Sequence, residues 1–140
     1  ILILITVIFT ATTSGQHTKE SREKIMALKV AFLTQELELS ALEAQKFWPA
    51  YNQHQEKLEV LRAKSRSKIR DKIKEVGDLN KLEESEAKRL VLLKMNLEKK
   101  MLNQKESFLI ELVLILPYKK IMKLYISERE FARQLSKCFL

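Results

Sequence analysis

The fold is decided by residues 40–77, SALEAQKFWPAYNQHQEKLEVLRAKSRSKIRDKIKEVG. Ser40 and Glu43 form a capping box, in which each side chain accepts a hydrogen bond from the other residue's free backbone N–H. Apolar residues then recur mostly at steps of three or four, with gaps at 55 and 65: Ala44, Phe47, Trp48, Tyr51, Leu58, Leu61, Ile69, Ile73 and Val76. This pattern predicts one helix that starts at Ala41, extends for about 35 residues or about 52 Å, and ends at Gly77.

Pro49 lies inside this predicted helix. It has no N–H for the carbonyl of Gln45, so we expect a kink there rather than an end. Three further helices are predicted: residues 19–34, a helix starting at 83–86 and ending before Pro117, and a last helix with Pro117 in its first turn. Because residues 76–80 form a turn, the two long helices fold back on each other. The sequence therefore predicts an all-α fold of four helices with a long antiparallel helical hairpin.

The composition agrees with long helices. The chain has 140 residues but only two glycines and two prolines, which argues against a β-sandwich. This length suits a single all-helical domain, assigned to residues 16–140. The apolar stripes are narrow, so a monomer would leave apolar surface in water, and we expect a homodimer.

The first residues have the pattern of an export signal. Residues 1–9 are apolar apart from Thr6, the next six are small or hydroxylic, and no charge precedes His17. This predicts a signal peptide over residues 1–15, cut before Gln16, with Thr13 and Gly15 as the small residues at the cut. The apolar run is shorter than the roughly 20 residues that a membrane-spanning helix needs. The chain begins with Ile and has no positive n-region, so the signal is expected to be incomplete, and the predicted location is the periplasm.

The chain is basic, with a net charge of +8 and a pI near 9.6. A basic protein could bind nucleic acid, but export would remove that partner. A solvated surface, or one that attracts acidic or unfolded polypeptides or anionic lipid, remains open. Cys138 is the only cysteine, which excludes an intramolecular disulfide and leaves an inert thiol or an intermolecular bond.

No catalytic set is visible in the sequence. There are two histidines, and two glycines cannot form a phosphate-binding loop, so we expect a non-enzymatic protein without a cofactor. Ligand types for soft or borderline metals occur, but not at ligand spacing: His17, His54, Cys138, Met95, Met101 and Met122. No metal site is predicted from them, although metal sensing stays an alternative.

Charge is most uneven in residues 57–74. Arg62, Arg66 and Arg70 lie four residues apart, and Lys64, Lys68 and Lys72 form a parallel row, which we interpret as two adjacent basic ridges. The ridges form either a solvated face or a strip that attracts flexible polypeptide by charge and holds it by apolar contact. The candidate polypeptide-binding residues are Arg62, Arg66, Arg70, Lys64, Lys68, Leu61 and Ile69.

Trp48 and Tyr51 flank Pro49 and could form a ligand platform. They are in phase with Ala44 and Phe47, which favours core packing.

Residues 39–51, LSALEAQKFWPAY, resemble the first signature of the Spy/CpxP-like family, the LTxxQ proteins, and in particular a branch with the pattern L-[ST]-x-x-E-A-x-x-F-W-P-x-Y. A second segment, residues 116–124, is similar to the repeat of that signature near the chain end. In this chain Ser40 replaces Thr, Glu43 replaces Gln, and the second copy lacks Thr and Gln. The resemblance covers roughly residues 20–135, and its matching positions are Leu39, Ser40, Glu43, Phe47, Trp48, Pro49, Tyr51, Leu116 and Pro117.

The resemblance implies a periplasmic, cradle-shaped antiparallel dimer of bent helices. Members of this family include an ATP-independent chaperone, an accessory inhibitor of an envelope-stress sensor kinase, and metal-responsive sensors that control sigma factors. The leading hypothesis is a periplasmic stress-response protein that binds unfolded or partner polypeptides without ATP. The alternative is a regulatory sensor of an envelope signalling or sigma-factor system. A metal ion is one candidate for the input of such a sensor.

Overall fold

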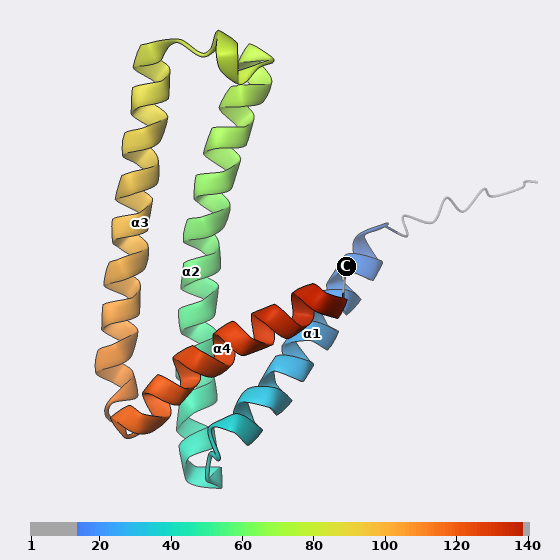
Figure 1. Cartoon of the computed structure of the whole chain (residues 1–140), viewed down its shortest axis with the longest axis vertical. Coiled ribbons are helices and arrows are strands. Elements are labelled where there is room, and N and C mark those ends of the chain that lie inside the picture. The colour runs from blue at the N-terminus through green and yellow to red at the C-terminus, as the bar shows by residue number, and fades with distance from the viewer. Residues whose placement is uncertain (1–13, 139–140) are drawn as a thin grey trace, which may run out of the picture. The chain divides into compact units, whose positions relative to one another are not determined.

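The computed structural model describes residues 14–138. Within this range it contains four α-helices, one short 3-10 helix and no strand, which confirms the predicted all-α class. The elements are α1 (Ser14–Glu36), α2 (Ala41–Val76), η1 (Leu79–Lys81), α3 (Glu84–Leu112) and α4 (Tyr118–Cys138) (Figure 1). The predicted signal peptide falls on residues 1–13, outside the described residues, and on the first two residues of α1.

The chain divides into two compact units. One unit contains α1 together with the residues from Leu124 onward, and the other contains Leu39–Lys123. The assignment of residues 16–140 to a single domain stays a prediction. Among the helices that the structure describes, none is both long enough and apolar enough to cross a membrane.

In the second unit, α2 has the limits that its sequence predicts. The Ser40 N–H donates to Glu43 Oε2 at 2.9 Å, and the Glu43 N–H donates to Ser40 Oγ at 3.2 Å, which confirms the capping box. The helix continues through Pro49 and ends at Gly77, whose φ is 83°. The Gly77 N–H donates to the Ile73 carbonyl at 2.9 Å, and this bond closes the last turn.

A short turn reverses the chain between α2 and α3. The Asp78 side chain accepts a hydrogen bond from the Asn80 N–H at 3.0 Å and caps η1. Glu84 and Glu86 lie in the first turn of α3, where carboxylates favour the positive end of a helix. Figure 1 shows α3 returning alongside α2. The side chains buried in these two helices are Phe47, Ala50, Tyr51, His54, Leu58, Leu97, Phe108 and Leu112.

The burial in α2 is concentrated in its first half. Beyond Leu58, the stripe residues Leu61, Ile69 and Ile73 are only half-buried. The part of the hairpin near η1 is therefore packed less fully than the part that contains Phe47 and Tyr51, because two paired helices cover only one side of each apolar stripe.

The connection between α3 and α4 differs from the prediction in detail. The third helix ends at Leu112, and the Leu116 N–H donates to the Leu112 carbonyl at 2.8 Å in a further turn. Pro117 precedes α4 rather than lying in its first turn, and its carbonyl accepts bonds from the N–H groups of Lys120 (2.9 Å) and Ile121 (3.2 Å). Proline suits this place because it has no N–H to leave unpaired at a helix start.

In the first unit, α1 packs against the part of α4 that begins at Leu124. The rings of Phe32 and Phe131 have centroids 5.6 Å apart, and Lys29 Nζ lies 3.6 Å from Glu128 Oε1. Leu33 and Leu37 are fully buried. The first helix was predicted over residues 19–34 and is longer at both ends.

Candidate polypeptide-binding strip on α2

All seven predicted binding residues lie on α2, but not on one surface. Successive residues of an α-helix are rotated by about 100°, so side chains two positions apart point about 200° apart. Arg62 and Lys64 therefore lie on opposite flanks of α2, and so do Lys68 and Arg70. The half-buried Leu61 and Ile69 belong to the stripe between the flanks. The two rows are therefore not adjacent ridges, as the sequence was interpreted, because the rotation between them places the apolar stripe in between.

The arginine flank is largely neutralised by neighbouring carboxylates. Arg66 Nη2 lies 2.6 Å from Glu59 Oε1, and Arg70 Nε lies 3.5 Å from Asp71 Oδ1. Arg62 is half-buried and has no ion-pair partner among the residues that the structure describes. This flank therefore offers little free positive charge to a ligand.

The lysine flank is different. Lys64 and Lys68 are exposed, and neither ammonium group has an acidic partner within the described part of the chain. Lys72 continues the row but lies 3.0 Å from Glu75 Oε1 and 3.9 Å from Glu86 Oε2, so it links α2 to α3. Lys64 and Lys68 are thus the exposed cations of the strip without an acidic partner in the described residues, whereas Arg62, which also has none, is half-buried.

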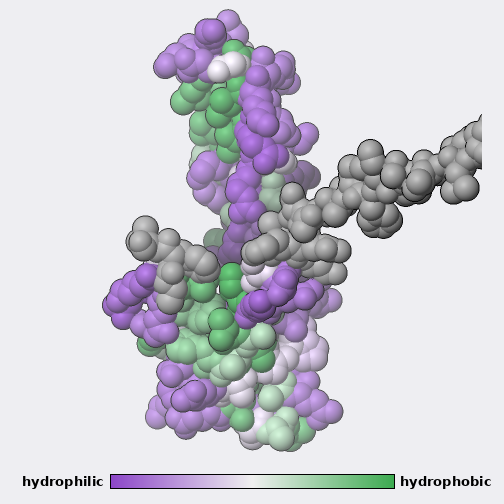
Figure 2. Space-filling model, turned by 90° about the vertical axis from the view of Figure 1, so that its right-hand side faces the viewer, coloured by the Kyte–Doolittle hydropathy of each residue, from purple (hydrophilic) through white to green (hydrophobic). Residues whose placement is uncertain are grey.

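Apolar surface is also exposed on α3. Met95 and Leu97 are two positions apart, so they face opposite ways, and Leu97 is buried while Met95 is 60% exposed. We call the exposed side the α3 outer face. Figure 2, which views the hairpin from the side of α2, shows further hydrophobic side chains at the surface near η1, beside a hydrophilic strip. The residues of the α3 outer face, each more than half exposed, are Val91, Leu92, Met95, Leu102 and Ile110.

The α3 outer face begins at a shallow groove of about 380 Å³. Its walls come from the first two turns of α3 alone: Glu84, Ser85, Ala87, Lys88, Val91 and Leu92. One helix surface cannot enclose a small molecule. The groove therefore extends the exposed face rather than forming a separate ligand site.

An ion pair joins the two segments that carry the family resemblance. Lys120 Nζ, from the second segment, lies 2.7 Å from Glu43 Oε2, in the first. The Lys120 hydrogen bond, followed by the bond from the Ser40 backbone N–H, lowers the pKa of Glu43 below its ordinary value of 4.5. Glu43 therefore caps α2 and also ties its first turn to the start of α4.

The other motif positions divide between core and surface. Phe47, Tyr51 and Leu116 are buried. Leu39 and Trp48 are half-buried, whereas Ser40, Pro49 and Pro117 are exposed. The motif residues thus mainly pack the core and cap α2, and few of them present a reactive or charged group to solvent.

The aromatic residues around Pro49 form a packed cluster. The rings of Phe47 and Tyr51 stack with centroids 5.2 Å apart, and Trp48 meets both edge-on, at 4.9 Å and 5.5 Å. Edge-on and stacked pairs at these distances stabilise a core. Tyr51 is buried in the core as predicted, whereas Trp48 is only half-buried.

His54 is a core residue that the sequence interpretation missed. It is 6% exposed, and its ring stacks on Phe108 of α3 with centroids 4.0 Å apart and planes 10° apart. Its burial could have been predicted from its position, three residues after Tyr51 and four before Leu58, on the same face of the helix.

No metal centre is assembled from the described residues, which contain no group of three or more His, Cys, Asp or Glu side chains able to hold an ion. The side chains of His17 and Cys138 lie outside those that the structure describes. The candidate site is therefore the lysine flank of α2. No protein-family model, curated protein or solved structure matches this chain.

Proposed function

We propose that this protein is an exported envelope-stress protein of the periplasm that binds unfolded or partner polypeptides, as a homodimer and without ATP or catalysis. The observation that carries the proposal is the pair of exposed, uncompensated cations Lys64 and Lys68 beside the half-buried Leu61. The export that it assumes depends on the signal peptide predicted over residues 1–15, of which residues 1–13 lie outside the described structure.

The proposed binding has two steps. Unpaired cations attract an acidic, flexible chain over about 8 Å at physiological ionic strength, and this raises the rate of encounter. Apolar side chains of the bound polypeptide then contact the edge of the stripe at Leu61. Because charge governs the first step, capture should weaken as salt is added, while the contact with Leu61 should depend less on salt.

The test is whether the protein, at stoichiometric amounts, slows the aggregation of a chemically denatured acidic enzyme. We expect K64E/K68E to lose most of this protection. R62E/R66E/R70E should lose less, because Arg66 and Arg70 are already paired with carboxylates. The charge-matched control is K100E/K105E, which reverses two exposed lysines of α3. Equal protection by K64E/K68E and the control would remove the strip from the proposal.

The alternative role, a regulatory sensor of an envelope signalling or sigma-factor system, predicts a different set of bound proteins. A chaperone should capture many polypeptides from a periplasmic extract, and a regulator should capture one. In either case, K64E/K68E should fail to capture what the wild-type protein captures. This loss would connect the bound proteins to the lysine flank.

A further inference from the structure

The fourth helix has apolar residues on two opposite sides. Ile121, Leu124 and Ser127 are buried on one side. The other side is in water, although its residues recur at steps of three or four as on a packed face. The exposed fractions are 71% for Tyr118, 58% for Met122, 43% for Tyr125 and 58% for Ile126. We call these four residues the α4 outer stripe.

Positive charge accompanies this stripe. The fourth helix carries six basic and two acidic residues. Both acids are engaged within the protein, because Glu128 Oε1 lies 3.6 Å from Lys29 Nζ and Glu130 Oε2 lies 2.7 Å from Arg133 Nη2. The local charge of α4 is therefore not cancelled by its own carboxylates.

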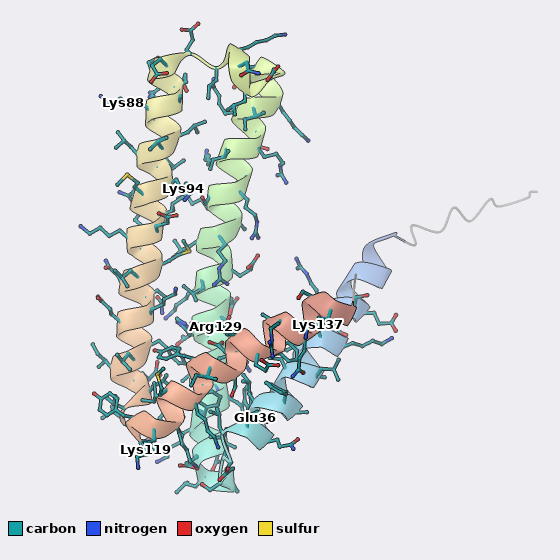
Figure 3. All side chains as sticks on the ribbon, in the orientation of Figure 1. Glu36, Lys88, Lys94, Lys119, Arg129 and Lys137 are labelled. Atoms are coloured by element: carbon teal, nitrogen blue, oxygen red, sulfur yellow. The ribbon has the colours of Figure 1, made fainter. Side chains whose placement is uncertain are left out.

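Three cations of α4 form no ion pair among residues 14–138: Lys119, Arg129 and Lys137. Lys119 and Arg129 have no acidic partner there, whereas Lys137 interacts with Glu130 at a longer range than an ion pair. Figure 3 labels them, spaced along the helix. Arg129 is four residues after Tyr125, so it continues the stripe itself, and the long side chains of Lys119 and Lys137 project beside it. A narrow apolar stripe with free cations along its length is typical of helices that lie on anionic membranes.

We propose that the α4 outer stripe binds the surface of an anionic phospholipid bilayer. The apolar side chains enter the boundary between headgroups and acyl chains, where tyrosine is favoured because its ring is apolar and its hydroxyl stays wet. Lys119, Arg129 and Lys137 contact lipid phosphates. All these residues belong to one convex helix surface, which fits a flat interface better than it fits a peptide, since a peptide needs a groove.

The test is flotation of the full chain with vesicles. We expect binding to vesicles of three parts phosphatidylcholine and one part phosphatidylglycerol, and no binding to pure phosphatidylcholine. R129E/K137E should reduce the bound fraction about tenfold or more, whereas the charge-matched K100E/K105E of α3 should not. M122S/I126S should weaken binding at low salt, and V60S, at a position of α2 that is 62% exposed, should have no effect.

Equal binding to neutral vesicles, or equal losses in R129E/K137E and in its control, would overturn the proposal. So would a loss of polypeptide capture in R129E/K137E with unchanged vesicle binding, because the stripe would then belong to a protein site. Circular dichroism of each variant separates a local effect from unfolding. R129E replaces R129E/K137E, and I126S replaces M122S/I126S, where the double variant does not fold.

Discussion

At the scale of single residues, Glu43 joins two groups, one beside it in sequence and one 77 residues away. Its carboxylate accepts bonds from the Ser40 N–H and from Lys120. Glutamine in its place would keep an acceptor for the N–H but lose the charge, and alanine would lose both. We expect E43A to lower the midpoint of urea unfolding more than E43Q does. E106Q, at an exposed position of α3, is the control and should leave the midpoint unchanged.

The same carboxylate makes stability depend on pH. The pKa of Glu43 in the folded protein is lowered, so its contribution is present above the ordinary value of 4.5 and is lost as the pH falls through the lowered value. The difference in unfolding midpoint between wild type and E43Q should therefore be larger at pH 7 than in acid. If this difference is the same at both pH values, the Glu43–Lys120 ion pair contributes nothing to the free energy of unfolding.

How much of the site could be predicted depended on distance along the chain. The Ser40–Glu43 capping box could be predicted because its two residues are three positions apart. The Glu43–Lys120 pair spans 77 positions, and no local pattern indicates it. The burial of His54 was also not predicted. Its spacing from Tyr51 and Leu58 places it on the apolar stripe of α2, but histidine is a polar residue type.

At the scale of elements, Gly77 ends α2 in a conformation that other residues avoid. Its φ is 83°, and no atom beyond Gly77 itself and its two chain neighbours lies within 4 Å of the position that a Cβ would take. The cost of G77A is thus backbone strain alone, which we expect to destabilise the protein by about 1 kcal/mol. G77N should cost less, since asparagine tolerates this conformation. Urea unfolding measures both, and equal stability of G77A and wild type would contradict this account of the helix end.

The helices were predictable to the degree that their ends carry local signals. The limits of α2 follow from the Ser40 box and from Gly77, and both were right. The third helix has no side-chain cap at Glu83, and it ends at Leu112 without a glycine. Pro117 therefore indicated only the last position that this helix could reach. The opposite flanks of the basic strip followed from helical rotation and needed no structure.

At the scale of the whole molecule, we expect the proposed homodimer to form through the α3 outer face. Val91, Met95 and Leu102 are four and seven residues apart, a spacing that suits pairing with another helix. A lysine there would place an unpaired ammonium group in an apolar contact, at a cost of roughly 2 kcal/mol or more.

We therefore expect M95K and L102K to be monomers at concentrations where the wild-type chain is a dimer, as measured by sedimentation equilibrium. V60K is the matched control, because Val60 is an equally exposed apolar residue on α2. It should leave the dimer intact. If V60K and L102K dissociate alike, the copies do not meet through α3, and a wild-type chain that is a monomer at every concentration would rule out the proposed homodimer.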